Sequence, residues 1–175
     1  MATLISGSTG VNKITDGTIT NADIASGAAI AGSKLVMSTG TVLQVVTGET
    51  TVQTVMNSTT FAATSLSASI TPSSTSSKIL VQLTSNLESN TAGERAVFAI
   101  YRGSEHIAEG HTLQPSGASG SSVFPIALQK LDSPSTASAV TYYLYIKRTS
   151  ATIVANINGG GSTTMGTITL MEIAG

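Results

Sequence analysis

The chain has 175 residues and a formal net charge of −1, and only 10% of its residues are charged. The few Lys and Arg residues are scattered, which argues against a nucleic-acid partner and against a basic helix at a membrane surface. No apolar run approaches the roughly 18 residues of a spanning helix, so we expect no membrane insertion, and the absence of cysteine excludes disulfides and thiolate metal sites.

The first 40 residues are rich in Gly, Ala, Ser and Thr and contain no aromatic residue. Large apolar residues recur there at steps of five or six, at Ile14, Ile19, Ile24, Ile30 and Leu35. A helix requires steps of three and four, and a strand requires steps of two. Because so few apolar residues cannot form a core within one chain, we predict an extended arm over residues 1–40. These five residues would anchor or assemble it by burial against sister arms or a host surface.

From residue 41 onward, short β-branched and apolar segments alternate with turn residues, which predicts strands. The predicted strands are Thr41–Thr47, Thr60–Thr64, Leu66–Ile70, Lys78–Leu87, Glu94–Arg102, Glu105–Glu109, Ser121–Lys130, Ala137–Arg148, Thr152–Ile157 and Thr163–Ile173. Pro125 places its strand at a sheet edge or at a bulge. We therefore predict an all-β fold, an antiparallel jelly-roll-like sandwich over residues 41–175 that forms a knob after the arm.

The alternation of apolar and polar residues along these strands predicts which residues lie in the core of the knob or in a subunit interface. The six assigned residues are Phe98, Ile100, Tyr143, Tyr145, Ile168 and Leu170. The tyrosines have a second interpretation, because Tyr142, Tyr143 and Tyr145 could stack on the rings of a sugar. Adjacent aromatic residues on a central strand more often serve the core and the subunit interface, and we favour that role.

Glu172 lies in phase with Ile168 and Leu170 on the last predicted strand. If that face is buried, the carboxylate needs a partner, because an unpaired charge is costly to remove from water. Arg95, Arg102 and Lys147 are the candidate partners.

The segment Glu105–His111 carries the most suggestive ligand chemistry, with two carboxylates and two imidazoles. On a regular strand Glu105, Glu109 and His111 share a face and His106 points away, which spoils a three- or four-ligand site. We therefore predict no metal and no cofactor. A site built by three copies of one histidine on a symmetry axis remains an alternative.

No catalytic residues are predicted. The nine acids are dispersed, whereas glycoside hydrolysis needs a carboxylate pair flanking one bond. Serine, histidine and aspartate are present, but a triad is recognised by geometry, and no Gly-x-Ser-x-Gly elbow occurs. We expect a protein that is not an enzyme.

Three sequence segments resemble fibre and appendage proteins of tailed bacteriophages: Ile14–Leu35, Ile70–Val81 and Gly166–Ile173. The part after the arm is also similar to trimeric jelly rolls of the C1q and tumour-necrosis-factor type. The resemblance implies a homotrimer that is made in the host cytoplasm and displayed on the virion surface. Its arm would attach to the major capsid protein or another virion protein.

These 175 residues are fewer than in ordinary tail fibres, and we expect neither a separate tail-adaptor domain nor a long shaft. This departure favours a head fibre or capsid decoration protein. Two alternatives remain open: a receptor-binding tail fibre tip that recognises a host surface glycan, and a glycan depolymerase.

Overall fold

The computed structural model describes residues 26–28, 38–89, 92–93, 95–113, 122–149 and 165–175, together with the backbone of residues 155–157. Contacts between Cα atoms divide the chain into two units, Met1–Val36 and Met37–Gly175. The five residues assigned to anchoring, Ile14, Ile19, Ile24, Ile30 and Leu35, lie outside the described residues. The role of the arm therefore stays a prediction.

Strands dominate the described part of the second unit, as its β-branched and aromatic segments predict. They are β1 (Val42–Thr50), β2 (Val55–Met56), β3 (Ala62–Ile70), β4 (Lys78–Ser89), β5 (Arg95–Arg102), β6 (Glu105–Leu113), β7 (Ser122–Asp132), β8 (Val140–Arg148), β9 (Ala155–Ile157) and β10 (Gly166–Ile173). All the described pairings between them are antiparallel.

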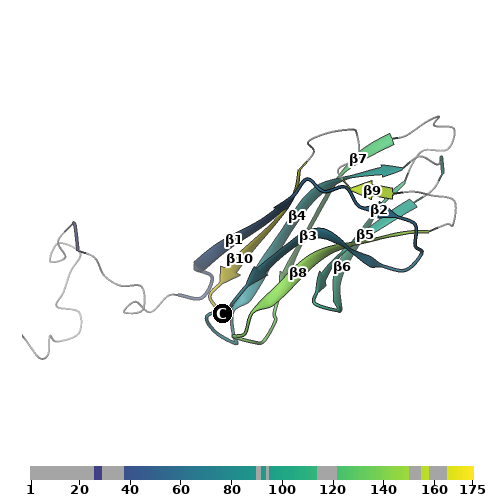
Figure 1. Ribbon diagram of the computed structural model, residues 1–175. Coiled ribbons are helices and arrows are strands. Elements are labelled where there is room, and N and C mark those ends of the chain that lie inside the picture. The colour runs from purple at the N-terminus through teal and green to yellow at the C-terminus, as the bar shows by residue number, and fades with distance from the viewer. Residues whose placement is uncertain are drawn as a thin grey trace, which may run out of the picture. The chain divides into compact units, whose positions relative to one another are not determined.

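The strands form two sheets, which Figure 1 shows facing each other. In sheet A, β4 pairs with β10 and β9 along one edge and with β7 along the other, and β1 pairs with β10. In sheet B the order is β3-β8-β5-β6. With the short β2 and β9 set aside, the orders β1-β10-β4-β7 and β3-β8-β5-β6 are those of a jelly roll. The predicted all-β, jelly-roll-like sandwich is confirmed for the described residues.

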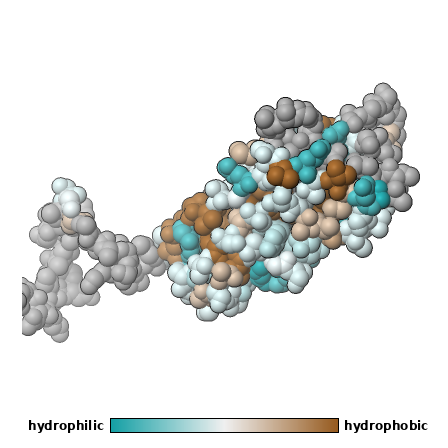
Figure 2. Space-filling view, in the orientation of Figure 1, coloured by the Kyte–Doolittle hydropathy of each residue, from teal (hydrophilic) through white to brown (hydrophobic). Residues whose placement is uncertain are grey.

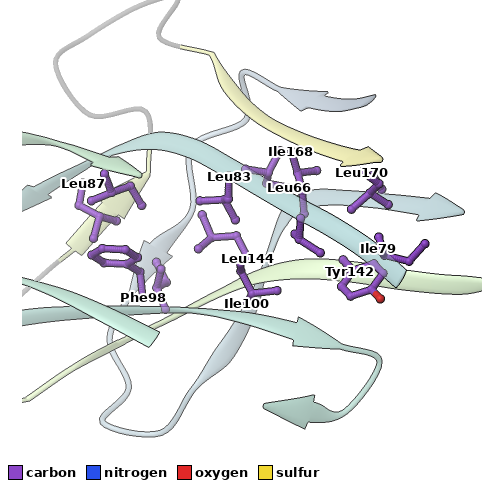
Figure 3. Close-up of a cluster of buried hydrophobic side chains, with 14 of the residues drawn as sticks. Leu66, Ile79, Leu83, Leu87, Phe98, Ile100, Tyr142, Leu144, Ile168 and Leu170 are labelled. Carbon is purple, nitrogen blue, oxygen red and sulfur yellow. The ribbon is translucent and has the colours of Figure 1, made fainter. Parts of the chain in front are cut away.

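The core lies between the two sheets, where inward-facing side chains interdigitate (Figure 3). On β4 the alternation is regular, because Ile79, Val81 and Leu83 are buried and the residues between them are not. Phe98, Ile100, Ile168 and Leu170, four of the six residues predicted for core or interface, belong to this cluster. Tyr143 and Tyr145 do not, because the inward-facing residues of β8 are Tyr142, Leu144 and Ile146.

Several strand boundaries differ from the prediction by a few residues, and the two-residue strand β2 was not predicted. The segments predicted as separate strands around Thr64 and Ser67 form one strand, β3, whose pairing with β8 shifts register between Ala63 and Ser67. The strand beginning at Glu105 continues to Leu113. Pro125 lies on β7 with an unbroken register opposite Asn86, so it marks no bulge. It occupies an outer strand of sheet A, where its missing N–H breaks no ladder.

The two sheets approach each other closely where β1 passes β3. A Cβ atom at Gly48 would lie 1.9 Å from the carbonyl oxygen of Ser67, so only glycine fits without a shift of the backbone. This contact closes one edge of the sandwich.

Candidate assembly surface

The outer face of sheet A carries a row of large apolar side chains that crosses four strands. Val45 of β1 pairs with Met171 of β10, Met171 pairs with Leu80 of β4, and Leu80 pairs with Leu131 of β7. We call these four residues the apolar row. Val45 is 55% exposed and Leu131 is 48% exposed, whereas Leu80 and Met171 are half-buried. Figure 2 shows hydrophobic residues over the end of the sandwich where Figure 1 places β1 and β10.

The row faces outward because its neighbours in sequence face inward. Leu170 and Val81 are fully buried in the core, and successive residues of a strand point to opposite faces of the sheet. The backbone that carries Met171 and Leu80 is thus fixed by core packing on the opposite face. The apolar row therefore has a defined position on an ordered sheet.

Neutral polar side chains adjoin the row on the same face. The next register row consists of Thr47, Thr169, Gln82 and Gln129, and the row after it consists of Thr167, Thr84 and Ala127 with Glu49 at its β1 end. These short side chains leave a shallow hollow of about 350 Å³ over β10, β4 and β7. Among the described residues of this face, the charged side chains are Glu49, Lys78 and Glu88, and they lie at its margins.

The outer face of sheet B is different, because aromatic rings pack against each other across its strands. Tyr101 and Tyr145 are stacked with their ring centroids 4.0 Å apart, and Tyr143 meets Tyr145 edge-on at 6.2 Å. Phe61 lies 5.5 Å from Tyr101, and the Lys147 ammonium lies 4.3 Å from the Phe61 centroid. Tyr143 and Tyr145, predicted for core or interface, therefore belong to an aromatic cluster on an outer face.

This aromatic cluster covers the outer side of β5. Ala99, which pairs with Tyr145, is 0% exposed, and Val97, which pairs with Lys147, is buried as well. Desolvation by the surrounding groups raises the pKa of the Tyr101 hydroxyl, and the nearby Tyr145 and Glu109 raise it further. The outer face of sheet B thus forms a second small core from its own side chains.

On β6, which carries the potential metal ligands of Glu105–His111, the side chains alternate differently from the prediction. The pairing of β5 with β6 shifts register, so that Ile100 faces Ala108 and Tyr101 faces His106. The prediction that His106 points away from Glu109 is wrong, because His106 Nε2 lies 3.4 Å from Glu109 Oε2. Across the described ranges, no group of three His, Cys, Asp or Glu residues is placed to hold a metal ion.

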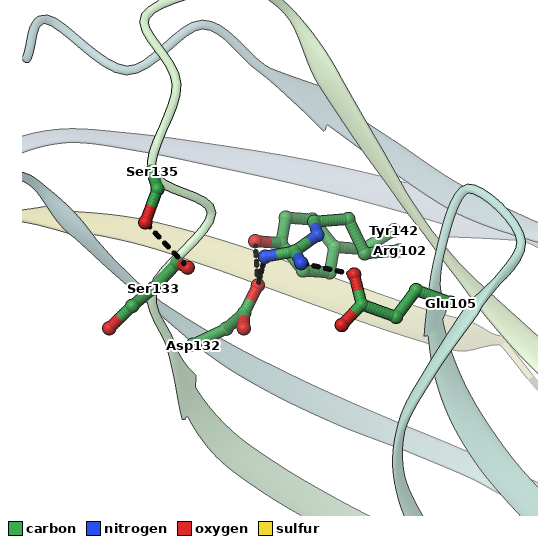
Figure 4. A network of polar contacts seen from close by, with 6 residues as sticks. All are labelled: Arg102, Glu105, Asp132, Ser133, Ser135 and Tyr142. Carbon is green, nitrogen blue, oxygen red and sulfur yellow. Dashed lines mark hydrogen bonds and ion pairs between the residues drawn. The ribbon is translucent and has the colours of Figure 1, made fainter. Parts of the chain in front are cut away.

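Asp132, at the end of β7, joins the two sheets (Figure 4). Its Oδ2 accepts hydrogen bonds from Arg102 at 2.6 Å and from the Tyr142 hydroxyl at 2.7 Å. Burial raises the pKa of Tyr142, and the bond to Asp132 raises it further. Burial alone would lower the pKa of Arg102, but its contacts with Glu105 and Asp132 outweigh that effect and raise it. This network has a structural role, because each charge meets its partner within the fold.

Glu172 is buried, as its phase suggests, but the predicted cationic partner is wrong. Its carboxylate accepts hydrogen bonds from Gln44 Nε2 at 2.6 Å, from Ser73 N at 2.7 Å and Ser73 Oγ at 2.6 Å, and from Ser77 Oγ at 2.7 Å. Burial alone would raise the pKa of Glu172, but the bonds from Ser73, Ser77 and Gln44 outweigh it and lower the pKa. Neutral donors therefore hold the charge and tie the 71–77 loop to β10.

Comparison with known proteins adds no relative: no protein-family model and no curated protein matches the chain. Within the part that the structure describes, no helix is long and apolar enough to cross a membrane.

Proposed function

We propose that this chain is a non-enzymatic structural protein of a phage virion, a homotrimeric head fibre or capsid decoration protein. In this proposal residues 1–40 attach it to the major capsid protein or another virion protein, and the knob projects outward. The observation that carries the proposal is the apolar row, four large side chains in register on an ordered sheet, of which Val45 and Leu131 are about half exposed. Contiguous exposed apolar surface marks sites of protein interaction.

The energetic scale supports assembly. Full burial of a Leu or Met side chain contributes roughly 1.5–3 kcal/mol, and a few such residues carry most of the binding energy of an interface. Repeated weak contacts around one symmetry axis reinforce each other, because each contact raises the effective concentration for the next. A row of four apolar residues therefore suits a symmetric oligomer.

The two most buried of the described carboxylates also favour a structural role for the protein. Asp132 links β7 to β5 and β8, and Glu172 fastens the 71–77 loop. Both carboxylates have their partners supplied by the fold, so their chemistry stabilises the sandwich.

The proposal is tested by the mass of the full chain and by its incorporation into particles. We expect the mass of a homotrimer in light scattering at micromolar concentration, and virion incorporation that is lost when residues 1–40 are deleted. Normal occupancy of particles without the arm contradicts the attachment. A monomeric full chain contradicts the trimer.

The aromatic cluster on sheet B favours a second function, the receptor-binding tip of a tail fibre. Tyr101, Tyr143, Tyr145 and Phe61 are partly exposed, and aromatic rings with polar edges suit sugar recognition. A glycan array probed with the full chain and with Tyr143→Ala tests this alternative. Binding that Tyr143→Ala abolishes supports it, and the absence of binding by the parent chain contradicts it.

A further inference from the structure

We propose that a second copy of this chain covers the apolar row, so that the outer face of sheet A is the surface through which copies meet. This inference rests on the proposed function, because it names the face and the partner that build the oligomer. The row crosses sheet A from β1 to β7. With strands about 4.8 Å apart, its length is on the order of 14 Å.

The polar chemistry of the face points to an identical partner. A face of one charge repels its own copy, whereas the register row that contains Thr169 and Gln82 carries no charge. Threonine hydroxyls and glutamine amides each donate and accept hydrogen bonds. Around the axis of a symmetric oligomer, where the same residues of each copy come together, Thr and Gln side chains can therefore hydrogen-bond to their counterparts. Glu49, Lys78 and Glu88 stand at the margin, where a charge stays hydrated.

The contrast with sheet B supports the choice of face. The rings of Tyr101, Tyr145 and Phe61 already pack against each other and cover Ala99. On sheet A, Val45 and Leu131 leave about half of their surface in water. The larger gain from excluding water therefore lies on sheet A.

The chain offers a matched pair of leucines for the test. Leu131 in the apolar row is 48% exposed, and Leu113 at the end of β6 in sheet B is 49% exposed. Because about half of each side chain is exposed and neither belongs to the core cluster, replacement by Gln removes exposed apolar surface and leaves the core residues in place. Val45→Thr is a second row variant, and it preserves a β-branched side chain.

The experiment measures the mass of the full chain over a dilution series by light scattering, with circular dichroism as the check on folding. We expect the parent chain and Leu113→Gln to stay associated at the same concentrations. We expect Leu131→Gln and Val45→Thr to dissociate at concentrations at least about tenfold higher, the scale for loss of an interface anchor.

Each other result overturns the inference in a recognisable way. If Leu131→Gln and Val45→Thr associate like the parent, copies meet through another face, and the proposed oligomer stands without this inference. If Leu113→Gln weakens association as much as Leu131→Gln, the effect is not specific to sheet A. A parent chain that is monomeric throughout removes the homotrimer and this face together.

Discussion

The two outer faces of the sandwich differ in what their side chains do for the fold. On sheet B, tyrosines on β5 and β8 stack at 4.0 Å and seal Ala99 beneath them. On sheet A, the apolar row runs from Val45 to Leu131, and these two end residues leave about half of their surface exposed. Long rings reach across neighbouring strands, whereas Val and Leu extend less far from the sheet. The apolar surface of an outer face can therefore be covered by long side chains of the same chain, or it can stay exposed and available to a partner.

The largest effect is expected at Gly48, because both faces exist only while the sandwich is closed. Gly48→Val forces a side chain into the Ser67 carbonyl, which a Cβ atom already meets at 1.9 Å. We expect a loss of about 3 kcal/mol or more in the free energy of unfolding, measured by urea denaturation. Thr47→Val, one position earlier and exposed, is the control. Equal stability of the two variants contradicts the close approach.

The next effect concerns Glu172, which fixes the end of sheet A. Replacement by Gln weakens charge-assisted hydrogen bonds from Ser73, Ser77 and Gln44, so we expect a loss of about 1.5–3 kcal/mol at pH 7. The folded-state pKa is lowered. The stability it provides is therefore fully present above the unfolded pKa of about 4.3 and is lost as the pH falls through the lower folded value.

Denaturation of the parent and Glu172→Gln at a series of pH values checks this prediction. The difference in the free energy of unfolding between the two proteins is expected to shrink as the pH falls below about 4. A difference that stays constant or grows in acid contradicts the lowered pKa of Glu172.

A smaller effect is expected where the sheets are joined by Asp132. Asp132→Asn weakens the bonds to Arg102 and Tyr142, and we expect a loss of about 1–3 kcal/mol. Glu105→Gln removes the other carboxylate of Arg102, but Glu105 is largely exposed, so its loss costs less than about 1 kcal/mol. If Glu105→Gln proves the more costly change in thermal denaturation, the joining role of Asp132 is wrong.

The smallest effect is expected on the aromatic face. Tyr145→Ser removes the ring that stacks on Tyr101, and such a pair contributes about 0.5–1.5 kcal/mol beyond its buried area. We expect a modest drop in the melting temperature and no change in oligomer mass. If Tyr145→Ser dissociates the oligomer while circular dichroism shows an intact fold, the interface lies on sheet B and the proposed interface on sheet A is wrong.

Much of the fold is predictable from the sequence, because alternation is a local property. The buried phase of Ile79, Val81 and Leu83, and the phase of Glu172, follow from a period of two. The shift that brings His106 beside Glu109 is not predictable this way, because one irregular pairing reverses every later residue on the strand.

The apolar row could not be predicted for a related reason. Leu80 and Met171 are visible as apolar residues between core positions, but their alignment with Val45 and Leu131 depends on register across four strands. The residues that donate hydrogen bonds to Glu172 are also far from it in sequence. Ser73, for example, lies 99 residues away. The Ser-rich Thr71–Ser77 loop is the one local signal for them, and it reads only as a turn.

The most direct test of the central claim is hydroxyl-radical footprinting of the full chain at low and high concentration. Met171 reports on the apolar row of sheet A, and Tyr143 reports on the aromatic face of sheet B. The account predicts that association protects Met171 from oxidation and leaves Tyr143 unchanged. Protection of Tyr143 with Met171 still reactive in the associated chain contradicts it.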